Sequence, residues 1–271
     1  MKKIFISLAS IIICLSSYAQ TSTSKWLIAP LTIDGDNADW GGTPSYYSSE
    51  CMIAYELKND SNNLFLVFEI MDKKSQTKFM QAGFEVAIKV KTKPKLNASI
   101  NFLAQQNQER SAQENEGFHN PNILHQGYLL NSRYAEVSGF LKTNKMITRN
   151  INGNQAFTYN IGWNDLNNML VEIRIPMSEV FGVENVAIDY TKIPISLTCK
   201  LKAIEHSSGE KLHSGGSDTN SRSASGGGRP GGGGSHGGGG RSGGQRASSS
   251  DMQTMNSVQS FKAKYVLSNG K

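Results

Sequence analysis

The amino-acid sequence predicts an all-β protein, an antiparallel β-sandwich. Short apolar or alternating segments recur along the chain, clusters of turn-forming residues separate them, and no repeating strand–helix–strand pattern accompanies them. We expect about nine or ten strands, one short helix, and a long disordered glycine-rich loop before the last strand.

The first 19 residues are typical of a secretory signal peptide. Lys2 and Lys3 precede an apolar run at 4–15, and Ala19 ends a small-residue cleavage site. The run is shorter than the about 20 residues of a membrane-spanning helix, and no later apolar stretch reaches that length. A lipid anchor on Cys14 is the alternative, which the isoleucines before it disfavour. We therefore expect export to the periplasm or the extracellular space, and no transmembrane segment.

The first half of the body predicts a hairpin, a helix and a strand. Residues 51–58 and 64–71 flank a cluster of Asn, Asp and Ser, which favours a tight turn between two strands. Residues 73–82 are predicted to form a helix that Gly83 ends. Residues 84–91 alternate between apolar and polar side chains, which is the pattern of a strand with one buried face.

The second half predicts another hairpin. Residues 146–151 and 155–161 bracket Asn152-Gly153, a pair that favours a type I′ turn because both residues tolerate positive φ. Strands are also predicted at 134–141, 170–175, 193–203 and 258–267, and a long polar loop at 105–122.

A glycine-rich insertion accounts for much of the basic character of the chain. Sixteen of the 27 glycines fall within 207–250, a segment without Phe, Tyr, Trp, Ile or Val, so it lacks the apolar surface needed to order itself. The formal net charge of +6 falls to +1 without this segment and the two signal lysines, which disfavours nucleic acid as a partner of the body. The insertion is either a neutral linker or a basic loop that contacts an anionic envelope or polysaccharide.

The expected organisation follows from these boundaries. We predict a signal peptide at 1–19, a single β-sandwich domain at 20–206 plus 251–271, and a disordered insertion at 207–250.

Several short motifs occur in the order found in one known family. Ile33-Asp34-Gly35 and Asp39-Trp40 are followed by Asn63-Leu-Phe-Leu66, Met71-Asp72 and Glu172-Ile-Arg-Ile-Pro176. This order, over residues 26–204, resembles the family 9 carbohydrate-binding modules met in exported bacterial proteins. The resemblance implies a jelly-roll β-sandwich and, in members that bind sugar, two exposed tryptophans that grip a sugar ring.

Trp163 is the candidate for such a sugar platform. It follows a predicted strand and precedes Asn164-Asp165, which places it near a loop. A core or edge position is the alternative, and Trp40 of the opening motif is expected to pack against a sheet. No second tryptophan can be named as a partner, so the resemblance supports the fold better than the ligand.

Asp34, Asp36 and Asp39 crowd the first turn of the body. Calcium takes about six to eight oxygen ligands, which closely spaced carboxylates can supply, so a structural calcium site is one interpretation. The simpler interpretation is that Asp34 caps a turn beside Gly35. No other cofactor is expected.

Cys51 and Cys199 are the two cysteines that remain after signal cleavage. Each shares its parity with apolar neighbours in a predicted strand, so both are expected to point inward. An oxidising compartment then favours a disulfide between them if their strands lie close enough. Two separately packed thiols are the alternative.

The sequence contains no recognisable catalytic motif. The five histidines do not have the spacing of a metal-dependent hydrolase, and neither a nucleophile elbow nor a phosphate loop occurs. We therefore expect an exported, non-catalytic β-sandwich that binds glycan. The alternatives are a structural or interaction protein of the cell envelope, and an enzyme whose paired carboxylates meet only in the folded chain.

Overall fold

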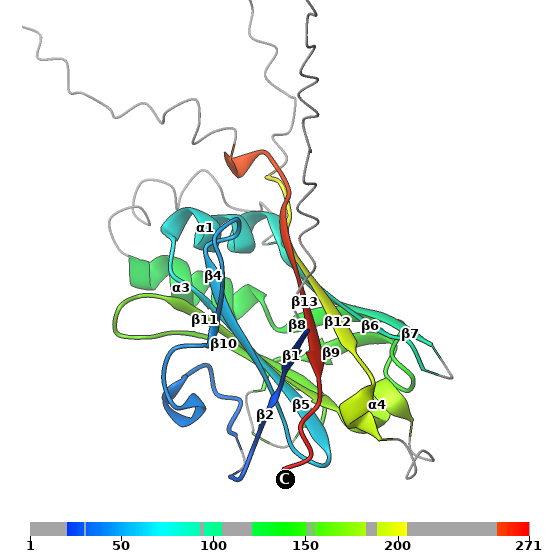
Figure 1. Cartoon of the computed structure of the whole chain (residues 1–271). Helices are drawn as coiled ribbons and strands as arrows, with labels where there is room; N and C mark the ends of the chain where they lie inside the picture. The colour runs from blue at the N-terminus through cyan, green and yellow to red at the C-terminus, as the bar shows by residue number, and fades with distance from the viewer. Residues whose placement is uncertain are drawn as a thin grey trace, which may run out of the picture.

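Two β-sheets packed face to face make up the protein (Figure 1). The structure, a computed structural model, describes residues 21–29, 31–92, 95–104, 121–150, 153, 155–182, 189–204 and 254–270. The seven-stranded sheet has the order β1-β13-β12-β6-β7-β8-β9, and the six-stranded sheet has the order β10-β11-β5-β4-β2, with β3 also paired to β4.

The strands are β1 (Thr21–Thr23), β2 (Lys25–Trp26), β3 (Tyr46–Ser48), β4 (Ile53–Asn59), β5 (Asn63–Ile70), β6 (Phe84–Val90), β7 (Leu96–Phe102), β8 (Tyr134–Ser138), β9 (Lys145–Thr148), β10 (Thr158–Trp163), β11 (Met169–Pro176), β12 (Ile195–Leu201) and β13 (Gln259–Val266). The helices are α1 (Lys73–Ala82), α3 (Pro121–Asn131) and α4 (Met177–Phe181), with 3-10 turns η1 (Ala38–Trp40) and η2 (Tyr190–Lys192).

The predicted β-sandwich is confirmed, but its sheets are mixed rather than purely antiparallel. Among the strands that the structure describes, β1 pairs parallel to β13 and β2 pairs parallel to β4, while the remaining strand pairs are antiparallel. Both exceptions involve the N-terminal segment, which adds to two existing sheet edges. No hairpin turn sets its direction, so it is free to run parallel to its neighbours.

Local chemistry explains the first hairpin and the first helix. The side chain of Asp60 accepts hydrogen bonds from the backbone N–H groups of Asn62 (2.7 Å) and Asn63 (2.6 Å), which closes the turn between β4 and β5. Asp72 caps α1 by accepting from Ser75 N (2.8 Å). Gly83, at φ +91°, ends the helix and donates to Phe79 O (2.9 Å). The predictions for this part of the chain are confirmed.

The predicted hairpin around Asn152-Gly153 is wrong. Gly153 has the positive φ of +78° that its turn requires, but β9 pairs with β8 in one sheet while β10 pairs with β11 in the other. The chain crosses between the sheets here because the alternate residues Tyr159 and Ile161 are buried in the main core. The positive φ of Gly153 agrees with the prediction, Asn152 lies outside the described residues, and tertiary packing decided the strand pairing.

The expectation of one short helix is also wrong, because three α-helices occur in the described part of the chain. Helix α3 begins at Pro121, within the loop predicted at 105–122, and the rest of that predicted loop lies outside the described residues. Strand β7 was not predicted either. A proline at the first position of a helix was the available signal for α3. Its burial of Tyr128, which is 2% exposed, shows why the helix forms: it closes one end of the sandwich.

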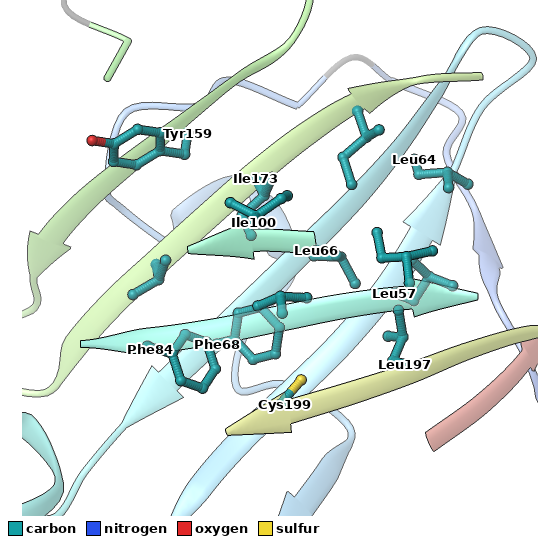
Figure 2. Packing of buried hydrophobic residues seen from close by; sticks show 14 of the residues in the cluster. Leu57, Leu64, Leu66, Phe68, Phe84, Ile100, Tyr159, Ile173, Leu197 and Cys199 are labelled. Carbon is teal, nitrogen blue, oxygen red and sulfur yellow. The ribbon is translucent and has the colours of Figure 1, made fainter. Parts of the chain in front are cut away.

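The main core lies between the inner faces of the two sheets (Figure 2). Leu57, Leu66 and Phe68 of the six-stranded sheet face Phe84, Ile100, Leu197 and Cys199 of the seven-stranded sheet. Helices α1 and α3 lie toward one end of the sandwich and α4 toward the other (Figure 1).

The predicted signal peptide and glycine-rich insertion lie outside the described residues. Within the residues that are described, no helix combines the length and the apolar character needed to cross a membrane.

Candidate functional site

The outer face of the six-stranded sheet is covered by the described residues between 27 and 42, which are 27–29 and 31–42. Phe65 and Val67 point outward from β5 and pack with Leu31, Ile33 and Trp40 in a second, smaller core. We call residues 27–29 and 31–42 the covering segment. Because this layer buries the sheet face, the face is not open to a ligand.

Glu172 on β11 fastens the covering segment to the sheet. Its Oε2 accepts hydrogen bonds from the backbone N–H groups of Asp34 (3.0 Å) and Gly35 (2.6 Å), and its Oε1 accepts from the indole Nε1 of Trp40 (2.5 Å). Burial raises the pKa of Glu172 to about 7, although the hydrogen bonds from Gly35 and Trp40 lower it. The early and late motifs of the sequence therefore meet in one buried hydrogen-bonded unit.

Trp40 has the packing role expected for it. Its side chain is 3% exposed, and the ammonium group of Lys58 lies 5.0 Å from its ring centroid while donating to the Trp40 carbonyl (2.5 Å). Burial lowers the pKa of Lys58. Lys58 and Glu172 both hold the same tryptophan, which makes it a structural residue rather than a sugar platform.

Each of the three aspartates of the first turn accepts a hydrogen bond from a different backbone N–H group. Asp34 accepts from Asp36 N (2.9 Å), Asp36 accepts from Ala38 N (3.1 Å), and Asp39 accepts from Thr32 N (2.6 Å). No group of three or more His, Cys, Asp or Glu side chains that could hold a metal exists among the residues described. Each aspartate thus accepts a backbone hydrogen bond within this segment, and the calcium site stays a prediction.

Trp163 is half-buried at the end of β10, where its ring is already in contact with α3. The imidazole of His125 stacks on it, with a centroid separation of 3.9 Å and an interplanar angle of 9°, and Tyr128 meets it edge-on at 6.5 Å. Its Nε1 donates to Oε1 of Gln76 on α1 (3.3 Å). One face of the indole is therefore covered by a side chain, and it is not an open platform on that side.

Two amides in the loop that follows Trp163 meet the carboxylate of Glu69 on β5. Glu69 Oε1 accepts hydrogen bonds from Asn164 Nδ2 (3.1 Å) and Asn168 Nδ2 (2.8 Å). Its Oε2 is buried and has no hydrogen-bond partner among the described groups. This cluster was not predicted, since Glu69 lies in an apolar strand and its partners are about a hundred residues away in the sequence.

Cys51 and Cys199 are both buried and both free, so the structure does not contain the disulfide that parity suggested. Parity placed both sulfurs correctly in the core. However, Cys51 precedes β4 of one sheet and Cys199 lies on β12 of the other, so the two thiols come from opposite sheets of the sandwich. Burial raises the pKa of Cys51 to about 11. Burial also raises the pKa of Cys199. Neither side chain is therefore a thiolate near neutral pH.

The outer face of the seven-stranded sheet is open. No outward side chain of β6, β7, β8, β12 or β13 is fully buried. Two adjoining hollows of about 450 Å³ and 380 Å³ lie on this face and share Ser138. We call them together the open-face groove. The first is lined by Asn101, Glu136, Val137, Ser138, Lys145 and Met146. The second is lined by Glu85, Ala87, Lys89, Asn97, Ala98, Ser99, Ser138, Thr198, Lys200 and Lys262.

The open-face groove follows from the alternating sequence of its strands. In β12, Leu197 and Cys199 point into the core, so Ser196, Thr198 and Lys200 must point outward. Strand register aligns Thr198 with Ala87 and with Lys262, and Ala87 with Ser99. The small side chain of Ala87 therefore lies between longer polar neighbours and produces the hollow.

Comparisons with known proteins give little beyond the fold. No protein-family model and no curated protein matches the chain. Among solved structures, it is similar to a family 9 carbohydrate-binding module from Caldicellulosiruptor kristjanssonii, solved in complex with glucose, with 11% identity and a TM-score of 0.31 over 67% of this chain and 78% of that one. A TM-score this low carries no argument about the ligand.

Proposed function

We propose that this chain is an exported, non-catalytic protein that binds glycan in the open-face groove. The observation that carries the proposal is the groove itself: a continuous, uncovered surface whose outward side chains are mainly hydroxyls, amides and charged groups. Such groups form hydrogen bonds with the hydroxyls of a sugar without needing a deep pocket.

The rim of the groove also offers an apolar surface for a sugar ring. Tyr134 shares its face of β8 with Glu136 and Ser138 and is 50% exposed, and Met146 opposite Glu136 is 57% exposed. Trp163 has a weaker claim to this role, because His125 stacks on it. The covered face of the six-stranded sheet offers no comparable surface.

Export rests on the N-terminal sequence. Two lysines, an apolar run at 4–15 and a small-residue cleavage site at 17–19 support transfer to the periplasm or the extracellular space. A glycan partner is available in either compartment.

A second candidate is an interaction protein of the cell envelope that uses the sandwich as a scaffold without binding sugar. The observation that favours it is the His125–Trp163 stack, which leaves no open tryptophan platform on that side.

A polysaccharide panel decides between the two candidates. Mature protein, residues 20–271, is screened on immobilised glycans, and hits are measured by calorimetry and assayed for turnover. We expect binding without turnover, and at least about tenfold weaker binding for Ala87→Trp, which fills the hollow. Ser61→Trp, on the exposed turn between β4 and β5, is the matched control and should bind normally. A panel with no hits would favour the scaffold, and turnover would indicate an enzyme.

A further inference from the structure

Three lysines on the face of the open-face groove lack an anionic partner among the described residues; Lys89 and Lys262 line the groove, and Lys264 lies two residues from Lys262. Lys89, Lys262 and Lys264 have exposed side chains, and none forms an ion pair or hydrogen bond with another described residue. Lys200 differs, because its Nζ lies 3.3 Å from Oε1 of Glu85. The outward side chains of this region therefore include three lysines without an ion-pair partner among the described residues and one lysine, Lys200, that is paired with Glu85.

Strand register brings these cations together. Lys264 pairs with Ser196, and Ser196 pairs with Lys89, so the two lysines lie two strands apart, about 10 Å between backbones. Lys262 lies two residues from Lys264 on the same face of β13, about 7 Å away. Like charges at these separations repel one another, and a bound polyanion would relieve that repulsion.

We infer that the open-face groove binds a polyanionic polysaccharide, with Lys89, Lys262 and Lys264 contacting its acidic groups. This inference rests on the proposed function and names the class of its ligand. The hydroxyls and amides between the lysines, Ser99, Asn97, Ser196 and Thr198, suit the sugar hydroxyls between successive charges. The occupant is a chain rather than a single sugar, because the groove continues across the strands to Glu136.

Other polyanions fit this face less well. Proteins that bind single-stranded nucleic acid place a series of aromatic side chains for base stacking, whereas Tyr134 is the one aromatic side chain among the described outward positions of β6, β7, β8, β12 and β13. An anionic membrane would call for exposed apolar side chains next to the lysines, and their neighbours in the groove are polar or alanine.

The test compares matched polymers that differ in charge. Binding of the mature protein is measured by calorimetry for polygalacturonate against fully methyl-esterified pectin, and for dextran sulfate against dextran. We expect the charged member of a pair to bind more tightly, and its affinity to fall as NaCl rises from about 0.05 to about 0.5 M. Polygalacturonate and dextran sulfate distinguish carboxylate from sulfate as the preferred acid.

Two double variants test whether the lysines of the groove contact the charged polymer. K89Q/K262Q should bind the charged polymer about three- to tenfold more weakly, since each exposed ion pair contributes modestly. K74Q/R133Q, which removes the same charge from α1 and from the residue before β8, should bind like the wild type. Circular dichroism and thermal melting confirm that both variants are folded.

The outcomes separate the two proposals. Equal binding of neutral and charged polymers, or equal loss in both variants, overturns this inference and leaves glycan binding intact. Binding of a thymidine homopolymer more tightly than either charged polysaccharide also overturns it. A glycan panel without any hit, charged polymers included, overturns both.

Discussion

The outer faces of the two sheets differ in what covers their charged residues. On the six-stranded sheet, Glu56, Lys58 and Glu172 point away from the main core and are nevertheless buried, at 2%, 7% and 0% exposure. On the seven-stranded sheet, the outward lysines and glutamates remain exposed or half-buried. The same alternation of side chains thus produces a closed layer on one side and an open surface on the other.

The partners of these charges explain the difference. Glu56 forms an ion pair with Lys25 at 2.5 Å, Lys58 donates to Trp40, and Glu172 accepts from Trp40 and the turn before it. These partners come from the N-terminal 42 residues, and Ser45, just beyond them, also donates to Glu56 (3.2 Å). A charge inside an apolar strand therefore indicates a segment that will cover it, whereas unpaired charges on an alternating strand indicate contact with solvent or ligand.

The largest expected effect on stability comes from replacing Glu172, which holds the covering segment on the six-stranded sheet. Glu172→Ala leaves three donors without an acceptor, two of them buried, so the free energy of unfolding should fall by about 3 kcal/mol or more, measured by urea denaturation. Glu85→Ala on the open face is the control and should cost less than about 1 kcal/mol. Similar losses in the two variants would contradict the distinction between the faces.

A backbone contact provides the second test of the covered face. A Cβ added at Gly162 on β10 would lie 2.1 Å from the carbonyl oxygen of Gly35, and neither backbone can yield easily. Gly162→Ala should therefore lower the free energy of unfolding by about 2–3 kcal/mol and speed proteolysis of the covering segment. Gly153→Ala meets no neighbouring atom, so it should cost only about 1 kcal/mol, from its positive φ. Equal sensitivity to protease would argue against close packing at Gly162.

The pH dependence of stability should also report on the covered face. The pKa of Glu172 is raised from 4.5 to about 7, so between these values the folded chain holds a proton that the unfolded chain releases. Stability should then decrease as pH rises through this window, by about 1–3 kcal/mol, and the added stability is fully present below about pH 4.5. The free energy of unfolding of the wild type and of Glu172→Gln is measured across this pH range, and the variant should lack this pH-dependent loss. If the free energy of unfolding depended on pH equally in the two proteins, Glu172 would titrate alike in the folded and unfolded states.

The smallest effect on stability is expected on the open face. Thr198→Val removes one hydroxyl that lines the groove and preserves the shape of the side chain. The free energy of unfolding should change by less than about 0.5 kcal/mol, while affinity for a bound glycan should fall about two- to fivefold. Thr77→Val on α1 serves as the distant control for affinity. A large loss of stability would mean that this face is structural.

Sequence reasoning succeeded where a single strand carries its own pattern. The alternation in β6 and β12 predicted one buried face each, and the Asn- and Asp-rich turn predicted the β4–β5 hairpin. These features depend on neighbours in the sequence, so local physics determines them.

Features that depend on distant contacts were missed. Glu172 was recognised only as part of a late motif, although a carboxylate within an apolar run signalled a buried partner. The stack of His125 on Trp163 depends on α3 lying against the end of β10, and the separation of Cys51 from Cys199 depends on which sheet each strand joins. Neither relation is encoded in residue spacing.

The place where the chain leaves β12 and returns to β13 has a consequence for how the length of the sequence can vary. The N–H of Ile204 donates to the carbonyl of Met255 (3.1 Å), and β12 and β13 then pair through Leu201 and Gln259, so the chain leaves the sheet and re-enters it at one point. Closing a loop between two fixed, adjacent ends depends only logarithmically on its length. Insertions and deletions between these ends should therefore be tolerated, and this point is a natural place to graft an additional module onto the sandwich.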